Sequence, residues 1–144
     1  MKAPAAVSRK VAMAVITGRH EIEIWGDGEQ TRSFMYIDDC LCGTQRLLHS
    51  DVEEPLNIGS DELVTINQLI DVVEEIAGVK LKRRYNLDAP IGVRGRNSNN
   101  TLVKAKLGWE PSIPLRVGME KTYRWIYAQA KAREEGRPFI SSAA

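Results

Sequence analysis

The sequence predicts an α/β fold built as a single compact domain. Segments with apolar residues at helical spacing alternate along the chain with short segments in which apolar and polar residues alternate. The chain has 144 residues, of which 43% are hydrophobic. A chain of this length buries about two-thirds of its unfolded surface in one core.

The first part of the chain predicts one helix and two strands. Residues 3–16 carry Ala, Val, Met and Ile at helical spacing, and Gly18 would end that helix. The segment EIEIW, residues 21–25, alternates charge with apolar bulk, as a half-buried strand does. The GDG that follows is typical of a tight turn, so we expect a return strand over residues 31–37.

Two helices and a strand are expected in the middle of the chain. Asp38 or Asp39 would cap a helix over CLCGTQRLLHS, because a short carboxylate accepts the open N–H groups of a first turn. Residues 54–60, EPLNIGS, predict a short apolar strand. Thr65 and Gln68 then form a capping-box pattern before an apolar run with helical spacing.

The last part predicts a strand, a long loop and two helices. KLKRRYN, residues 80–86, indicates a strand, and residues 89–100 are so rich in Gly, Asn and Pro that we expect a loop. A short helix over TLVKAKL and a final helix over residues 115–135 follow. We assign residues 1–136 to the domain and residues 137–144 to a flexible tail.

Composition narrows the classes of partner. The formal net charge is +1, from 20 basic and 19 acidic residues, so nothing predicts general binding to nucleic acid or to an anionic membrane. No apolar run is long enough for a membrane span, and the N-terminus lacks a signal-peptide core, so we expect a cytoplasmic protein. The two cysteines and two histidines are not spaced as metal ligands, and we predict no metal site.

Isolated cations near glycines or turns are the candidate site residues. No glycine-rich phosphate loop and no nucleophile-elbow motif occurs. The planar fork of arginine is suited to phosphate, and nearby glycines allow close approach of the backbone. Solvated surface charge is the alternative interpretation for each cation taken alone. The candidates are Lys2, Lys10, Arg32, Arg94 and Arg96.

The order of several segments resembles a known family. KAPAA with the following RK, WGDGEQTRSFMYIDD, EPLNIGS, GVRGRNSNN and LGWEPSIPL resemble the C-terminal portion of the extended short-chain dehydrogenase/reductase superfamily. The resemblance covers about residues 2–130. It is closest to the GDP-mannose 3,5-epimerases within the NAD-dependent epimerase/dehydratase family, where KAPAA and GVRGRNS are the narrower signals. It implies a C-terminal substrate-binding portion that lacks most of the Rossmann domain.

The resemblance also implies roles for individual residues. Lys2 matches a member of the acid/base pair that works on the sugar, although Met1 replaces the Glu that precedes this lysine in the family. A disordered terminal lysine is the alternative. The implied substrate-binding residues are Ala3, Lys10, Gln30, Thr31, Arg32, Arg96 and, in a tail that aligns less well, Ser142 or Ser141.

In the family, NAD transiently oxidises C4 of the sugar, and acid/base groups then invert C3 and C5. We expect NAD to be bound mainly by an N-terminal domain outside this chain, GDP-mannose or a related nucleotide-sugar to be the substrate, and a homodimer in the full-length protein. As part of a full-length protein the chain would belong to an isomerase, and alone we expect it to be inactive. A related 4-epimerase or 4,6-dehydratase, or a non-catalytic GDP-sugar-binding module, remains the alternative.

Overall fold

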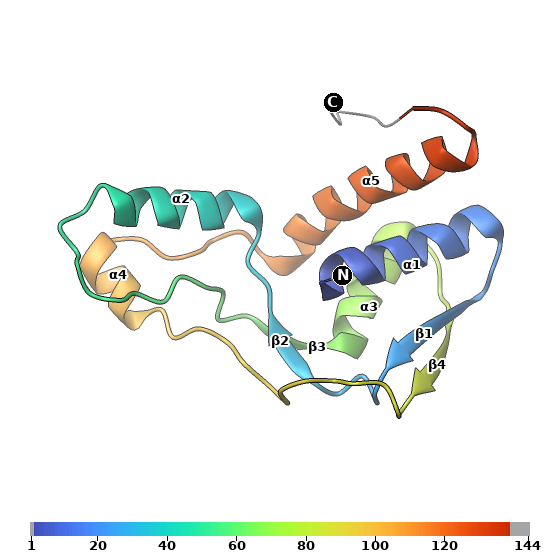
Figure 1. Ribbon diagram of the computed structural model, residues 1–144, viewed down its shortest axis with the longest axis horizontal. Helices are drawn as coiled ribbons and strands as arrows, with labels where there is room; N and C mark the ends of the chain where they lie inside the picture. The colour runs from blue at the N-terminus through green and yellow to red at the C-terminus, as the bar shows by residue number, and fades with distance from the viewer. Residues whose placement is uncertain (1, 139–144) are drawn as a thin grey trace.

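The structure is a computed structural model that describes residues 2–138. Three helices, α1 (Ala3–Thr17), α3 (Ile66–Ala77) and α5 (Leu115–Glu134), lie together beside a pair of strands, β1 (Glu21–Trp25) and β4 (Lys82–Asn86) (Figure 1). Helices α2 (Ile37–Leu48) and α4 (Thr101–Leu107) lie at the opposite end of the molecule. The predicted mixture of helices and strands is therefore confirmed.

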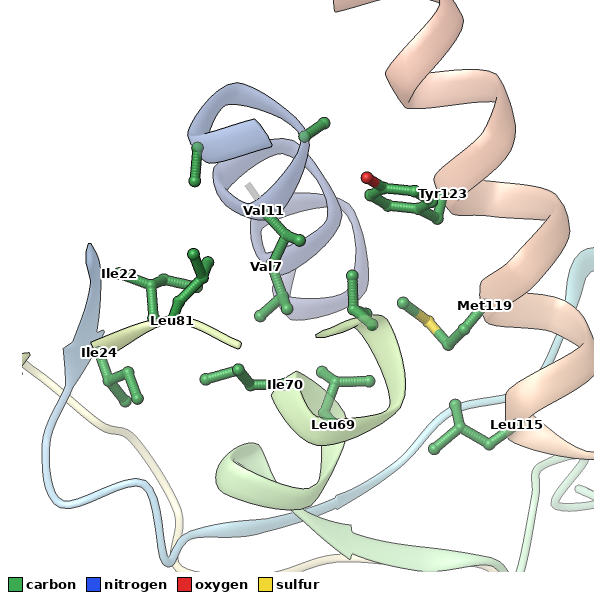
Figure 2. Packing of buried hydrophobic residues seen from close by; sticks show 13 residues of the cluster. Val7, Val11, Ile22, Ile24, Leu69, Ile70, Leu81, Leu115, Met119 and Tyr123 are labelled. Carbon is green, nitrogen blue, oxygen red and sulfur yellow. The ribbon is translucent and has the colours of Figure 1, made fainter. Parts of the chain in front are cut away.

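The hydrophobic core lies between α1, α3, α5 and β1. Val11 of α1 and Leu69 of α3 are fully buried, and Met119 of α5 reaches toward them (Figure 2). Ile22 and Ile24 of β1 close the core from the strand side. These side chains recur at the spacing of one helix face or one strand face, which is why the periodicity of the sequence found them.

Helix ends follow the sequence signals closely. Thr65 accepts the backbone N–H of Gln68, and the Gln68 side chain accepts the Thr65 N–H, so the predicted capping box at the start of α3 is confirmed. Gly18, Gly78 and Gly108 follow the ends of α1, α3 and α4 in the left-handed conformation that favours glycine. The predicted helix over residues 115–135 is found as α5.

The predicted return strand is shorter than expected and has a different partner. β1 pairs in parallel with β4, whereas β2 (Thr31–Ser33) pairs antiparallel with β3 (Leu63–Thr65). The turn between β1 and β2 directs the chain away from β1. Its Gly26 N–H continues the β1–β4 ladder to Asn86 O at 2.8 Å, and its Gln30 O accepts the Ile66 N–H at the start of α3.

Two further local predictions are wrong. The segment of residues 54–60 forms no strand, because it is not paired with a strand within residues 2–138. Neither Asp38 nor Asp39 caps α2, whose N-cap residue is Tyr36. Asp39 instead accepts the N–H groups of Ser112 and Ile113 at 2.9 and 2.8 Å. This buried carboxylate ties α2 to the segment that enters α5.

A group of charged side chains joins α3 to β4. Buried Glu74 accepts the Leu81 N–H at 3.0 Å and lies 2.8 Å from Lys80 Nζ. Arg83 lies 3.3 Å from Glu74 and 2.5 Å from Asp71. Burial alone would raise the pKa of Asp71, but hydrogen bonds from Lys80 and Arg83 outweigh it and lower this pKa below its ordinary value. The group therefore holds β4, and with it β1, against α3.

Among the described residues, no helix combines the length and apolar character that a membrane crossing requires. Within the same part of the chain, no three His, Cys, Asp or Glu side chains are grouped so as to hold a metal ion.

Candidate functional site

A groove of about 1620 Å³ lies between α1 and β1 and reaches the start of β2. Pro90 and Ile91 of the long loop also line it, together with residues of α3, β4 and α5. Five of the predicted site residues line this one groove, although up to 30 positions separate them in the sequence. These residues are Lys2, Ala3, Lys10, Gln30 and Arg32.

The N-terminal end of α1 forms one end of the groove. Lys2 is the N-cap residue and its side chain is exposed, and Ala3 is the first helical residue. The N–H of Ala3 has no acceptor within the helix, because the first four N–H groups of any helix lack one. The positive end of the helix dipole also lies here. This end of the groove therefore favours an anionic or hydroxyl-bearing ligand.

Lys10 bridges the two walls of the groove. Its Nζ donates to the backbone oxygen of Glu23 at 2.8 Å, which links α1 to β1. A lysine ammonium has three donors, so two remain for a ligand. Lys10 is two helical turns from Lys2 and on the same side of α1, which is why both line the groove.

Gln30 carries an unsatisfied acceptor in the groove. The residue is only 8% exposed, and its Nε2 donates to Trp25 O at 3.0 Å. Its Oε1 is buried and has no hydrogen-bond partner within residues 2–138. Burying an unpaired carbonyl oxygen costs about 1–3 kcal/mol, so a ligand hydroxyl or N–H at this place would remove that cost.

Arg32 fastens the long loop to β2. Its guanidinium donates to Ile91 O at 3.0 Å and to the Thr31 backbone oxygen at 2.6 Å. The Thr31 N–H donates to Arg94 O at 2.9 Å. The bonds to Ile91 and to Arg94 join segments about 60 residues apart in sequence and hold the loop at the groove. Arginine has five N–H donors, so Arg32 can still donate to a phosphate.

Two predicted residues do not reach the groove in this structure. Thr31 and Arg96 are absent from its lining, and the Arg96 side chain is exposed on the loop. Arg94, another candidate cation of the same loop, is exposed as well. The Thr31 N–H contacts the same loop two residues before Arg96, at Arg94 O. Ser141 and Ser142 lie outside the described residues.

The groove is more basic than the chain as a whole. Its lining contains six Lys or Arg residues against three Glu. Arg84 is already paired with Glu21 and Glu23. The other Lys and Arg residues of the lining give the groove an excess of positive charge, which favours a ligand that carries a diphosphate.

Asn67 was not found by sequence reasoning, although it contacts the turn that carries Gln30. Its side chain donates to Asp27 O at 3.2 Å and to Glu29 Oε1 at 2.6 Å. No spacing rule connects residues 38 to 40 positions apart. Within α3 it is one of several polar residues, so no local signal distinguished it.

The described residues do not fit a dinucleotide cofactor by themselves. A dinucleotide pyrophosphate is held by a glycine-rich turn that leads from a strand into a helix N-terminus. Here β1 leads through its glycine turn into β2, and β4 leads into the long loop. Among residues 2–138, no strand leads through such a glycine-rich turn into a helix N-terminus.

Comparison with known proteins agrees with this geometry. Residues 1–59 match the NAD dependent epimerase/dehydratase family. GDP-mannose 3,5-epimerase 1 of Oryza sativa subsp. indica is 48% identical over 128 residues, which are 89% of this chain and 32% of that protein. The chain thus spans about a third of the length of this relative.

Two solved structures share the fold. UDP-glucose 4-epimerase of Thermotoga maritima, solved with UDP-glucose, superposes with a TM-score of 0.77 at 28% identity, over 90% of this chain and 40% of that one. UDP-glucuronic acid 4-epimerase of Bacillus cereus, solved with UDP-4-deoxy-4-fluoro-glucuronic acid and NAD, superposes with a TM-score of 0.74 at 27% identity, over 85% of this chain and 40% of that one. The chain is therefore part of an epimerase-family domain, similar to about a third of GDP-mannose 3,5-epimerase.

Proposed function

We propose that this chain forms the nucleotide-sugar-binding part of a GDP-mannose 3,5-epimerase-like enzyme. The observation that carries the proposal is that Lys2, Lys10, Gln30 and Arg32 line one basic groove. The 48% identity to GDP-mannose 3,5-epimerase over most of the chain supports the choice of GDP-mannose. A homodimer of the full-length protein is part of the same proposal.

Each side chain has a defined task in this proposal. The guanidinium of Arg32 and the N-terminal end of α1 bind the diphosphate, because both present donors to negative charge. The free Oε1 of Gln30 accepts a ligand N–H or hydroxyl. Thr31 and Arg96, which do not line the groove, and Ser142, which lies outside the described residues, remain proposed substrate-binding residues on the ground of the family resemblance.

Lys2 is the proposed acid/base residue. Its Nζ removes a proton from the sugar ring when neutral and returns one when protonated, so it can act on one face of the ring. Inversion also needs a second acid/base group on the opposite face of the ring. We assign that task to no described residue of the groove. Because the described residues do not cradle NAD, we propose that NAD is bound mainly outside this chain.

Incubation of the purified chain with GDP-mannose and NAD tests the catalytic half of the proposal. We expect no epimerisation, measured by proton NMR of the sugar ring. Conversion of GDP-mannose by the purified chain would show that the described groove is catalytically sufficient and would contradict the proposal.

A 4-epimerase of UDP-sugars is the second candidate, because UDP-sugar 4-epimerases share the fold. Calorimetric titrations with GDP-mannose and UDP-glucose separate the two. We expect GDP-mannose to bind more tightly, and tighter binding of UDP-glucose would favour the 4-epimerase.

A further inference from the structure

We propose that Asn67 is a positioning residue for the nucleotide-sugar groove. It lies in the first turn of α3 and holds the turn of residues 26–30, so that Gln30 and Arg32 keep their places at the groove. This inference rests on the proposed function. It assigns a role to a residue that does not itself line the groove.

The donor side of Asn67 holds the turn. The backbone N–H of Asn67 donates to Gly28 O at 3.0 Å, while its Nδ2 donates to Asp27 O at 3.2 Å and to Glu29 Oε1 at 2.6 Å. One residue thus contacts three consecutive residues of the turn. The N–H of the preceding residue, Ile66, donates to Gln30 O at 3.2 Å. The start of α3 therefore determines where the turn ends.

The acceptor side of Asn67 is fixed by β4. Its Oδ1 accepts the Tyr85 hydroxyl at 3.1 Å and Arg83 NH1 at 3.3 Å. Arg83 is itself paired with Asp71 and Glu74 of α3. The amide therefore uses two donors and accepts two hydrogen bonds, which is its full capacity. Its orientation is defined from both sides, as a positioning residue requires.

Close packing gives independent support. Gly28 has a φ of 78°, and a Cβ at Gly28 would overlap the Asn67 side-chain amide. The turn and the amide are thus in direct contact, with no room for an intervening water. A movement of Asn67 must move the turn, and Gln30 lies two residues further along the chain.

The test exchanges the donor and the acceptor in the contact between Asn67 and Glu29. Asn67→Asp keeps the acceptor for Tyr85 and Arg83 but faces the Glu29 carboxylate with a second carboxylate. The substitution removes both hydrogen bonds that Asn67 Nδ2 donates, to Asp27 O and to Glu29 Oε1. We expect GDP-mannose to bind at least about tenfold more weakly, since a loss of about 1.4 kcal/mol is a tenfold change. The double variant Asn67→Asp with Glu29→Gln restores a donor opposite an acceptor at residue 29, while the bond to Asp27 O stays lost. We therefore expect a partial recovery, with affinity about threefold higher than in Asn67→Asp.

Gln68→Ala is the matched control. Gln68 lies next to Asn67 and closes the capping box, but it does not contact the turn. We expect a lower melting temperature and unchanged affinity. Equal affinity in Asn67→Asp and wild type, or no recovery in the double variant, would overturn the inference.

Amide hydrogen exchange separates this inference from the proposed function. The Thr31 N–H, bonded to Arg94 O, reports the position of the turn without any ligand. We expect it to exchange about tenfold faster in Asn67→Asp than in wild type or Gln68→Ala. If the wild type fails to bind GDP-mannose, the proposed function fails alone. If Thr31 exchange is unchanged in Asn67→Asp, the positioning role fails whatever the binding result.

Discussion

Replacing Glu74 by Ala tests how α3 and β4 are held together beneath the groove. The Glu74 side chain is only 2% exposed. Its Oε1 accepts the Leu81 N–H at 3.0 Å, and its Oε2 lies between Lys80 and Arg83. The substitution leaves the N–H of a buried residue without its acceptor. It also removes one buried methylene group and one carboxylate that faces two cations.

The magnitude follows from these contacts. An unpaired buried N–H costs about 1–3 kcal/mol, and the lost methylene costs about 0.8 kcal/mol. Arg83 keeps Asp71 at 2.5 Å, so its charge stays compensated and the larger penalty for an unpaired buried charge does not apply. We expect Glu74→Ala to lower the free energy of unfolding by about 2–4 kcal/mol.

Urea unfolding followed by circular dichroism measures this loss, with Glu74→Gln as the control. The amide oxygen of Gln can still accept the Leu81 N–H, so we expect a loss of about 1 kcal/mol for this variant. The slope of the free energy against urea concentration should not change, because the surface exposed on unfolding stays the same. A loss below about 1 kcal/mol for Ala, or equal losses for Ala and Gln, would refute the assigned role of the buried carboxylate.

Three further outcomes are expected. Burial opposes the ionisation of Asp71, but hydrogen bonds from Lys80 and Arg83 outweigh it and lower the pKa of this carboxyl. The ionised carboxylate therefore stabilises the fold above the ordinary pKa of aspartate, and this stabilisation is lost as the pH falls through the lowered pKa. Urea midpoints of wild type and Asp71→Asn should therefore converge toward low pH, and a constant difference would contradict this. Gly28→Ala should lower the free energy of unfolding by about 1–3 kcal/mol more than Gly18→Ala, because both glycines have positive φ but only at Gly28 would the added Cβ overlap a side chain, that of Asn67. Equal losses of stability in thermal unfolding would contradict this close contact. Amide exchange should be faster in α2 than in α1 and α3, because no α2 residue belongs to the described hydrophobic core, and equal protection would show that α2 is held by contacts of similar strength.

Local signals predicted most of the helices. The capping box at Thr65 and the glycine after α3 act within one or two turns of the chain, so the sequence alone contains them. The apolar faces of α1 and α3 were readable for the same reason, because burial repeats with the helical period.

Strand pairing was not readable in the same way. β1 and β4 are each visible as strands, but their pairing depends on contacts between residues about 60 positions apart. The tight turn at GDG suggested a hairpin, whereas Asn67 and Ile66 draw this turn toward α3. The segment of residues 54–60 has a strand-like composition without a partner strand in the described chain.

The candidate site was found through family resemblance more than through the residues alone. Each cation, taken singly, was compatible with solvated surface charge. The structure brings Lys2, Lys10 and Arg32 to one groove, which single positions could not indicate. It leaves Arg96 exposed and outside the lining of that groove. The role of Lys2 as an acid/base residue stays a prediction.

The central claim is that this groove binds a nucleotide-sugar diphosphate, and one calorimetric comparison tests it most directly. GDP-mannose is titrated into the wild type, into Arg32→Ala and into Arg46→Ala, a control that removes an exposed arginine of α2 outside the groove. We predict saturable binding to the wild type and to Arg46→Ala, and binding about 10- to 100-fold weaker to Arg32→Ala, as expected when hydrogen bonds to a charged group are lost. No saturable binding to the wild type, or equal affinity in Arg32→Ala and wild type, would contradict the claim.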